Sequence, residues 1–249
     1  MFDYSLTAYL ALFAASLLVG FSKTSVGGMV ILAVPLVAIG FPAKDSIGIL
    51  LPIMVFGDIM AVIYYRRSCD WSIILKFFPI TAIGILIGYF LLDLINPDIF
   101  SIVLGVIITV MLVAGYLIEG KELKARQGLI YRWIVGILVG IASMMANAAG
   151  PLLGIYFLQL GLSKREFIGT RSWYFLVLNL FKVPFSISLG LITPETFALN
   201  LLFLPVIILG AVVGYMVIGM INTNVFKTII RIAAGITAVR LIYVGITSL

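Results

Sequence analysis

The chain has no histidine, and this absence excludes several kinds of chemistry. Without imidazole there is no haem ligation through histidine, most zinc sites cannot form, and no imidazole can relay protons. Cys69 is the single cysteine, so a disulfide cannot form within the chain. We therefore expect no metal site and no cofactor.

Charged residues are also scarce, and hydrophobic residues take their place. Asp, Glu, Lys and Arg make up 10% of the 249 residues, hydrophobic residues make up 63%, and the mean hydropathy is +1.26. Soluble domains have an apolar share of only ~45–50%. The longest polar stretch, Glu119–Arg132, leaves no room for a soluble catalytic module. We therefore predict one polytopic membrane domain over residues 1–249, and no enzyme.

The net charge of +6 does not indicate a nucleic-acid partner in a chain of this composition. In a membrane protein, basic residues gather in short loops, where they set the orientation of the helices. Residues 1–4 lack the basic region and the small-residue cleavage site of a signal peptide. We therefore expect no binding of nucleic acid, and we expect the first apolar segment to be retained.

The two halves of the sequence repeat each other. At one fixed offset, Pro79, Gly84, Gly88, Tyr89, Ile95, Asn96 and Phe100 match Pro205, Gly210, Gly214, Tyr215, Ile221, Asn222 and Phe226. With a slightly shorter offset, Gly20, Gly40, Lys44-Asp45 and Gly48 match Gly140, Gly161, Arg165-Glu166 and Gly169. Internal repeats of this kind are typical of secondary transporters. We predict repeat one over 5–118 and repeat two over 131–248, joined by a linker over 119–130.

Two pairs of glycines within these repeats lie one helical turn apart. They are Gly84 with Gly88, and Gly210 with Gly214. Small residues at this spacing let membrane helices approach closely. We therefore expect these glycines to lie at helix contacts.

Apolar segments divide into about five per half. They cover 5–20, 28–41, 46–66, 72–92 and 97–118, then 131–146, 150–161, 167–190, 197–218 and 225–247. A crossing needs about 20 residues, so 28–41 and 150–161 are too short and are expected to be broken or re-entrant helices. Each half then crosses an odd number of times. The predicted fold is an all-α polytopic membrane protein with two inverted-topology repeats.

The basic residues of the loops give the expected orientation. If the linker with Lys121, Lys124, Arg126 and Arg132 is cytoplasmic, the loops containing Arg66-Arg67 and Lys164-Arg165 fall on the same side. The opposite loops then carry Lys44 as their basic residue. This distribution satisfies the positive-inside rule. It predicts a cytoplasmic linker and two chain ends on the outer side.

Polar interruptions of the apolar pattern are the candidate binding regions. The first is Ser22-Lys23-Thr24-Ser25-Val26-Gly27-Gly28, and the second runs over 143–151. Glycines permit unusual dihedrals, and an unwound stretch frees N–H groups that protein, water or substrate must satisfy. The N-terminus of a half-helix favours an anion. Packing glycines and helix kinks are the alternative explanation.

Ionisable side chains inside apolar segments add to this picture. An ammonium at the bilayer centre costs at least ~2.5 kcal/mol, so Lys23 should face a cavity or a partner. Asp58, whose repeat mate is Asn179, either carries a coupling role or forms a salt bridge with Lys23 or Lys182. Lys182 lies on one helical face with Asn179 and Arg171, although Arg171 at a segment end also suits an anchor.

The predicted site collects the residues of the two interruptions and of this helical face. The substrate-binding candidates are Ser22, Lys23, Thr24, Ser25, Gly27, Gly28, Asn147, Ala148, Gly150, Arg171, Asn179 and Lys182. Asp58 is the candidate coupling residue. Helix capping is the alternative role for Asn147, and capping or helix contact is the alternative for the Ser and Thr hydroxyls.

These motifs resemble the sulfite exporter TauE/SafE family, also called the toluene-sulfonate uptake permease family. The resemblance rests on residues 20–28 with Pro35, and on Asn147-Ala148-Ala149-Gly150-Pro151 leading to Gly161-Leu162-Ser163. The family's first motif often has a longer glycine run, which is reduced here to Gly27-Gly28. The resemblance implies a bacterial inner-membrane carrier that moves sulfite, sulfoacetate, sulfonates or related sulfur anions, usually outward.

We therefore expect a secondary transporter that exports small sulfur-containing anions by alternating access, with both termini periplasmic. Its expected partners are the anion, the lipid bilayer and a coupling ion, either a proton or sodium. The alternative is a carrier or channel for another small anion, and saturating flux with counter-transport would indicate a carrier. An intramembrane enzyme is disfavoured because Asp58 is the one carboxylate clearly placed at mid-membrane. The oligomeric state is left open.

Overall fold

The structure is a computed structural model that describes residues 4–25, 29–96, 98–99, 128–158 and 160–217, with isolated positions between 102 and 113 and between 235 and 247. Most of the predicted segments 97–118 and 225–247 and of the linker 119–130 lies outside the described residues, as do Gly27 and Gly28. The predicted domain and repeat boundaries therefore stay predictions.

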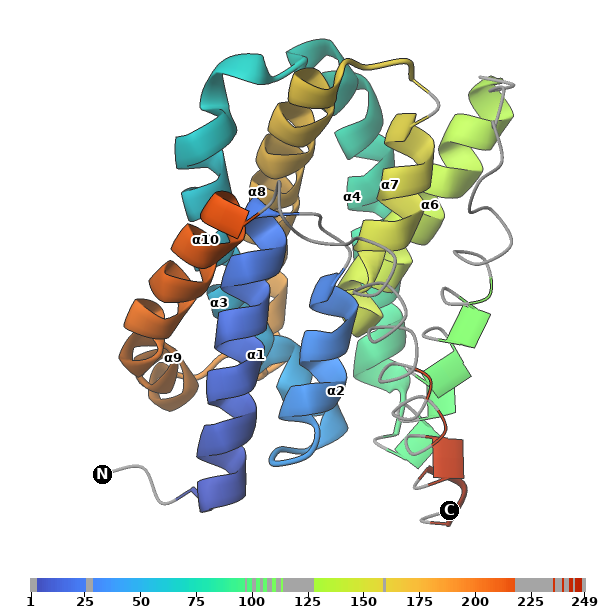
Figure 1. The fold of residues 1–249 in the computed structure, drawn as a ribbon. Coiled ribbons are helices and arrows are strands. Elements are labelled where there is room, and N and C mark those ends of the chain that lie inside the picture. The colour runs from blue at the N-terminus through green and yellow to red at the C-terminus, as the bar shows by residue number, and fades with distance from the viewer. Residues whose placement is uncertain are drawn as a thin grey trace.

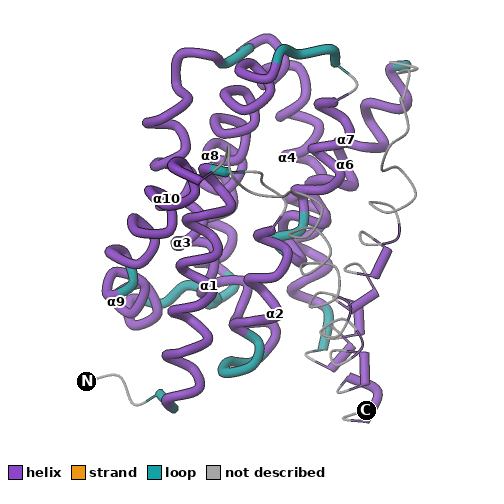
Figure 2. Tube along the Cα trace, viewed as in Figure 1, coloured by secondary structure: helices purple, strands orange, loops and turns teal. Residues whose placement is uncertain are grey.

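All regular secondary structure in the described ranges is helical (Figure 2). The first half contains α1 (Leu6–Thr24), η1 (Met29–Leu32), α2 (Ala33–Val37), α3 (Ala43–Tyr65), η2 (Arg66–Ser68) and α4 (Trp71–Leu94). The second half contains α6 (Leu129–Ala146), α7 (Ala149–Leu158), α8 (Lys164–Ser188), α9 (Pro194–Leu202) and α10 (Leu204–Val217). The all-α prediction is confirmed for this part of the chain.

Several of these helices have the length and apolarity that a membrane crossing requires. In the described residues four single helices qualify, α1, α3 with η2, α4 and α6, and the bent pair of α9 and α10 can act as one more. Large apolar side chains lie on the outside: Leu75 is 71% exposed and Leu94 is 82% exposed. Such a surface suits contact with lipid rather than water. The protein is a multi-pass membrane protein.

Side-chain caps explain where several helices begin. Ser5 accepts a hydrogen bond from the amide of Ala8 at the start of α1, and Asp70 accepts one from Ser72 at the start of α4. Ser163 forms a capping box with Glu166, so α8 begins at Lys164 rather than at the predicted residue 167. A cap shifts a boundary that hydrophobicity alone places too late.

The predicted single segment 197–218 is two helices. α9 and α10 meet at Phe203 with a bend of 50°. Pro205 lies in the first turn of α10, and its ring nitrogen has no hydrogen to donate to a carbonyl one turn earlier. The bend therefore falls where the helical hydrogen bonds are interrupted.

Both predicted interruptions are shorter than the sequence pattern indicates. α1 continues to Thr24, so Ser22 and Lys23 lie in its last turn and not in an unwound stretch. α6 likewise continues to Ala146, and α7 already begins at Ala149. Both short elements remain too short to cross a bilayer, since α2 has 5 residues and α7 has 10.

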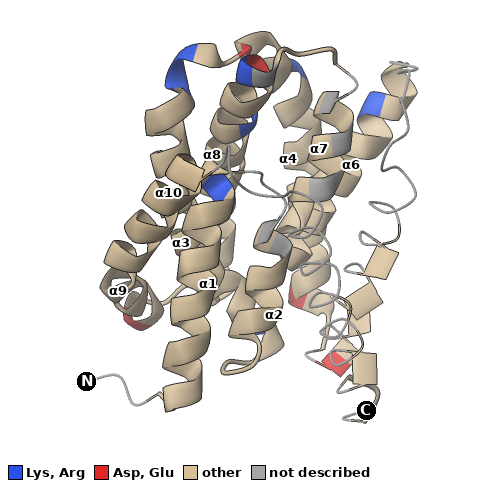
Figure 3. Ribbon diagram, in the orientation of Figure 1, with Lys and Arg blue, Asp and Glu red and all other residues tan. Residues whose placement is uncertain are grey.

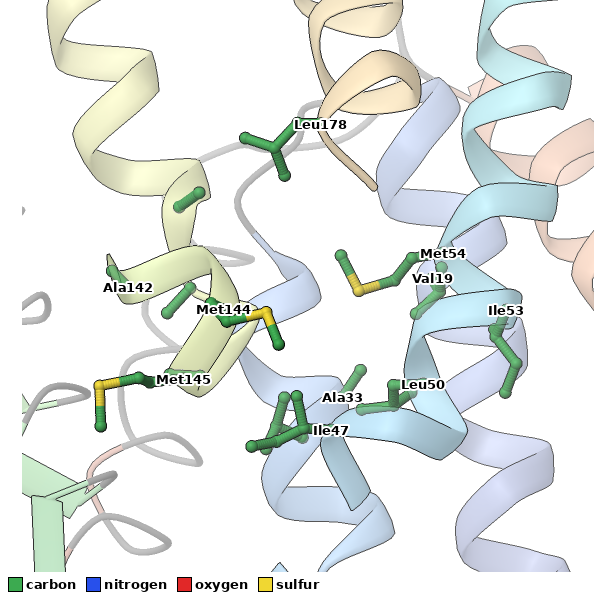
Figure 4. Packing of buried hydrophobic residues seen from close by; sticks show 14 of the residues in the cluster. Val19, Ala33, Ile47, Leu50, Ile53, Met54, Ala142, Met144, Met145 and Leu178 are labelled. Carbon is green, nitrogen blue, oxygen red and sulfur yellow. The ribbon is translucent and has the colours of Figure 1, made fainter. Parts of the chain in front are cut away.

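The helices pair across the two halves of the chain. α1 packs against α10, α4 packs against α6, and α3 packs against α8. In Figure 1, α1, α3 and α10 run in one direction, whereas α4, α6 and α8 run in the other. The buried hydrophobic core lies between these helices, and Figure 4 shows Met54 of α3 and Met144 of α6 reaching into the space between them.

Glycines allow the crossed pairs to approach closely. A Cβ atom at Gly84 would overlap the carbonyl oxygen of Ile137 in α6, and one at Gly210 would overlap that of Leu17 in α1. Gly88 and Gly214 also lie against these partner helices. The prediction that these glycines form helix contacts is confirmed.

Most charged residues lie near the ends of the helices (Figure 3). The end of α3, the start of α6 and the start of α8 lie at the same end of the bundle (Figure 1). These ends carry Arg66, Arg67, Arg132 and Arg165. These described basic residues therefore share one side of the bundle, as the predicted topology requires.

Candidate functional site

Lys23 and Asp58 form a buried ion pair at the centre of the site. Lys23 Nζ lies 2.6 Å from Asp58 Oδ1, and the two side chains are 6% and 1% exposed. The last turn of α1 supplies the lysine and the middle of α3 supplies the aspartate. Gly57 permits this approach because the lysine stem passes over it: a Cβ there would meet Lys23 Cγ at 3.1 Å.

The other oxygen of the carboxylate is also held. Asn179 of α8 donates from Nδ2 to Asp58 Oδ2 at 2.6 Å. The aromatic ring of Phe175, one turn earlier on α8, has its centroid 4.5 Å from Lys23 Nζ. A cation over an aromatic face is attracted by the ring quadrupole. Ion pair, amide and ring together fix the position of the ammonium.

Lys182 belongs to a second, adjoining network. Its Nζ donates to the carbonyl oxygen of Ser143 at 2.7 Å and to Asn147 Oδ1 at 2.5 Å. The side chain is fully buried. Both acceptors belong to the end of α6, so the lysine joins α8 to the break between α6 and α7.

Asn147 occupies this break for a conformational reason. Its φ is 51°, in the left-handed region, which asparagine tolerates better than most residues. Its side chain also donates from Nδ2 to the carbonyl oxygen of Ile47 in α3 at 3.0 Å. Asn147 therefore ends α6 and links α3 with α8 through Lys182.

A small cavity lies against both networks. Its volume is about 30 Å³, which is space for water-sized molecules. The lining residues are Ser22, Lys23, Val30, Met54, Asp58, Ala61, Asn147, Ala148, Gly150, Arg171, Ser172 and Phe175. The described lining thus carries two cationic side chains, Lys23 and Arg171, and one carboxylate, Asp58.

The structure brings most of the predicted site residues together. Seven of them line the cavity: Ser22, Lys23, Asp58, Asn147, Ala148, Gly150 and Arg171. Asn179 and Lys182 contact lining residues without lining the cavity themselves. Thr24 donates instead to the carbonyl oxygen of Ala211 at 2.7 Å, and Ser25 donates to that of Phe21 at 2.6 Å. Those two hydroxyls are engaged with backbone.

Sequence reasoning missed five lining residues, namely Val30, Met54, Ala61, Ser172 and Phe175. Helical spacing is a signal that could have found some of them. Met54 and Ala61 lie four before and three after Asp58, and Phe175 lies four after Arg171. The faces that carry the charged residues therefore also carry these apolar neighbours.

The donors around the cavity suit an anion better than a metal ion. Ammonium, guanidinium and amide groups all present N–H bonds. In the part of the chain that the structure describes, no group of three or more His, Cys, Asp or Glu residues could hold a metal ion.

One comparison with known proteins gave a match. The family model described as sulfite exporter TauE/SafE matches residues 12–241, nearly the whole chain. No curated protein and no solved structure gave a significant match.

Proposed function

The chain belongs to the sulfite exporter TauE/SafE family, and we propose that it is a secondary transporter that exports a small sulfur-containing anion of the sulfite or organosulfonate type. The observation that carries this proposal is the excess of cations in the cavity lining. Lys23 and Arg171 face a single carboxylate, Asp58, among the described lining residues.

The energetic argument follows from the membrane environment. A cation at mid-membrane is costly unless a partner or water compensates it. Asp58 compensates Lys23 in the ion pair. Arg171 adds a second positive charge, so the charged side chains of the described lining are net positive and attract an anion. Ser22 and Asn147 supply polar groups at the same cavity.

The start of α7 supports an anion in the same place. Ala148 and Gly150 line the cavity, and they belong to the break before α7 and to its first turn. The first amides of a helix lack intrahelical acceptors, and the helix dipole adds partial positive charge there. The start of α7 and the two cationic side chains, Lys23 and Arg171, therefore all favour a negatively charged ligand.

The contacts between the halves support inverted repeats. Each contact occurs twice, with the two halves in exchanged roles. Gly84 of the first half contacts Ile137 of α6, and its repeat mate Gly210 contacts Leu17 of α1, the residue that matches Ile137. Gly20 on Ile207 and Gly140 on Thr81 form a second exchanged set. The matching helices also run in opposite directions (Figure 1). A twofold axis in the membrane plane would produce both features.

The short α2 and α7 support a site at the meeting point of the repeats. Both are too short to cross, and both are proposed to be re-entrant or broken helices. α7 begins beside the cavity, where Ala148 and Gly150 line it, and Val30 of η1, which precedes α2, lines it as well. We infer that alternating access exposes the cavity first to one side and then to the other. The basic loops suggest that the linker faces the cytoplasm, which puts the termini in the periplasm of a bacterial inner membrane.

Reconstituted protein allows a direct test. Proteoliposomes are assayed for uptake of sulfite, thiosulfate, sulfate and methanesulfonate, with counter-transport from preloaded vesicles. We expect saturable uptake and exchange of at least one sulfur anion. Lys23→Met should weaken its apparent affinity about tenfold or more, because a charge-assisted hydrogen bond contributes ~1.5–3 kcal/mol.

Lys76→Met is the matched control, since Lys76 is exposed on α4. Equal affinities of the two folded variants would contradict the cationic site. Flux without saturation or exchange would indicate the alternative, a channel for a small anion. Absence of both binding and transport for all four anions would refute the proposed substrate class.

A further inference from the structure

The carboxylate of Asp58 already uses donors that a bound oxyanion would need. Its Oδ1 is paired with Lys23 and its Oδ2 accepts from Asn179, each at 2.6 Å. The same carboxylate lines the cavity with Lys23 and Arg171. An anion that enters the cavity therefore competes with Asp58 for Lys23.

Other charges act on the carboxylate from the helices packed around α3. Lys23 of α1 and Arg171 and Lys182 of α8 interact with it electrostatically. Tyr174 of α8 is hydrogen-bonded to Thr81 of α4. The helices α1, α3, η2, α8, α9 and α10 carry further described titratable side chains, and these lie toward the helix ends. They are Tyr9, Lys44, Asp45, Tyr64, Tyr65, Arg66, Arg67, Arg165, Glu166, Glu195 and Tyr215. Asp58 is thus the negative group nearest the cavity among the described residues.

An ionised Asp58 repels an anion in the cavity and offsets part of the attraction that Lys23 and Arg171 exert on it. The cavity is small, about 30 Å³, so the ligand and the carboxylate would lie within a few ångströms of each other. Like charges at that distance repel, and the repulsion grows where water is excluded. Neutralising Asp58 removes the repulsion and frees Lys23 for the ligand.

Asn179 offers a hydrogen-bond acceptor that suits this neutralised state. Its side chain is fully buried, and its Oδ1 has no hydrogen-bond partner among the described residues. The same amide donates from Nδ2 to Asp58 Oδ2. A protonated carboxyl group facing an amide can form two hydrogen bonds, accepting N–H on one oxygen and donating O–H from the other. An O–H group on Asp58 would supply the partner that Asn179 Oδ1 lacks among the described residues.

Building on the proposed anion site, we propose that each anion binds together with one proton, which Asp58 and Asn179 hold as an acid–amide pair. The proton is taken up from solution and forms an O–H bond with Asp58 Oδ1. This oxygen leaves Lys23 and donates to Asn179 Oδ1, while Oδ2 keeps its bond to Nδ2. The anion takes the place of the carboxylate on Lys23. For a monoanion, the net charge of the site is unchanged, and a proton rather than sodium is the coupling ion.

Binding measurements across pH test this linkage. The probe is methanesulfonate, which stays a monoanion throughout the range, and the protein is the purified full chain. At pH values where Asp58 is ionised in the anion-free protein, we expect the dissociation constant of methanesulfonate to rise about tenfold per pH unit, because binding then requires uptake of one proton. Asp58→Asn, which is neutral at every pH, should bind with a pH-independent affinity close to the strongest wild-type value. Asp93→Asn, the same change at an exposed carboxylate of α4, should behave as wild type.

Proton uptake on the unmodified protein provides an independent readout. Adding methanesulfonate to weakly buffered protein with a pH indicator should remove about one proton from solution per anion bound. This measurement decides the proposal even if Asp58→Asn fails to fold.

The outcomes distinguish a failure of the proton linkage from a failure of the proposed function. Methanesulfonate binding without pH dependence or proton uptake would overturn the proton linkage and leave the proposed transporter intact. Loss of binding in a folded Asp58→Asn variant would also overturn it, because a purely structural ion pair predicts that loss. If wild-type protein binds neither methanesulfonate nor any other anion of the uptake panel, both the linkage and the proposed function are wrong.

Discussion

Asp58 and Asn179 occupy matching positions of the two predicted repeats, and their side chains are hydrogen-bonded to each other. Matched residues meet in this way where two related units face each other across a symmetry axis. An aspartate on one side and an asparagine on the other make this contact asymmetric in charge. The difference between one carboxylate oxygen and one amide nitrogen is what gives the site a group that can take up a proton.

Lys182→Met should lower stability as well as anion affinity. The substitution leaves Asn147 Oδ1 and the carbonyl oxygen of Ser143 without the donor they now share. An unsatisfied buried acceptor costs ~1–3 kcal/mol. A lower midpoint of thermal unfolding in detergent, measured beside Lys76→Met, is the expected result. Unfolding at the wild-type temperature would contradict the role of Lys182 as a link between α6 and α8.

Replacements of Asn147 can separate its backbone role from its side-chain role. Asn147→Gly keeps easy access to the left-handed conformation but loses the bonds to Lys182 and Ile47. Asn147→Ala loses the same bonds and adds a left-handed strain of ~1–2 kcal/mol. Thermal unfolding should rank wild type above glycine and glycine above alanine. Equal stability of the two variants would mean that the positive φ contributes nothing.

Gly140→Ala should destabilise the pair of α4 and α6. A Cβ at this position would overlap the carbonyl oxygen of Thr81, which is backbone and cannot move aside alone. Overpacking of this kind costs ~1–3 kcal/mol. Gly154→Ala is the matched control, since a Cβ there meets nothing within 4 Å in the described structure. Denaturation curves of the two variants that coincide would refute the close helix contact.

The thiol of Cys69 should react slowly at neutral pH. Burial raises its pKa to about 11, and the nearby charge of Asp70 contributes in the same direction. Because the thiolate is the reactive form, the labelling rate should rise about tenfold per pH unit up to that pKa. An impermeant maleimide at mildly alkaline pH should reach Cys69 in inside-out vesicles but not in intact cells. Labelling in intact cells would overturn the proposed orientation.

Some of the site could be predicted because its chemistry is local. A lysine and an aspartate in apolar segments have few ways to avoid the cost of burial, and the structure selects Lys23 over Lys182 as the partner of Asp58. The glycines that repeat between the halves likewise indicated helix contacts, and they lie there.

Other features depend on contacts between segments far apart in the chain. α1 continues past the start of the predicted break, and Thr24 in its last turn is bonded to Ala211 in α10, a partner that no local pattern reveals. Phe175 and Met54 line the cavity only because their helical faces turn toward Lys23 and Arg171. Periodicity gives the face of a helix but not the neighbour that the face meets.

α1 packs against α10 and α4 packs against α6, so each of these pairs joins one helix from each half of the chain. This arrangement has a consequence for the two halves when they are produced separately. If the first half were produced alone, the helix surfaces at Gly20 and Gly84 would lack the helices that pack against them. The second half alone would likewise lack the helices that pack at Gly140 and Gly210. Each half carries the complement of the other. A gene divided in the linker should therefore give two fragments that accumulate only when they are made in the same cell. If the proposed inverted repeats arose by duplication, an ancestral protein of one half would have needed two copies, inserted in opposite orientations, to be stable.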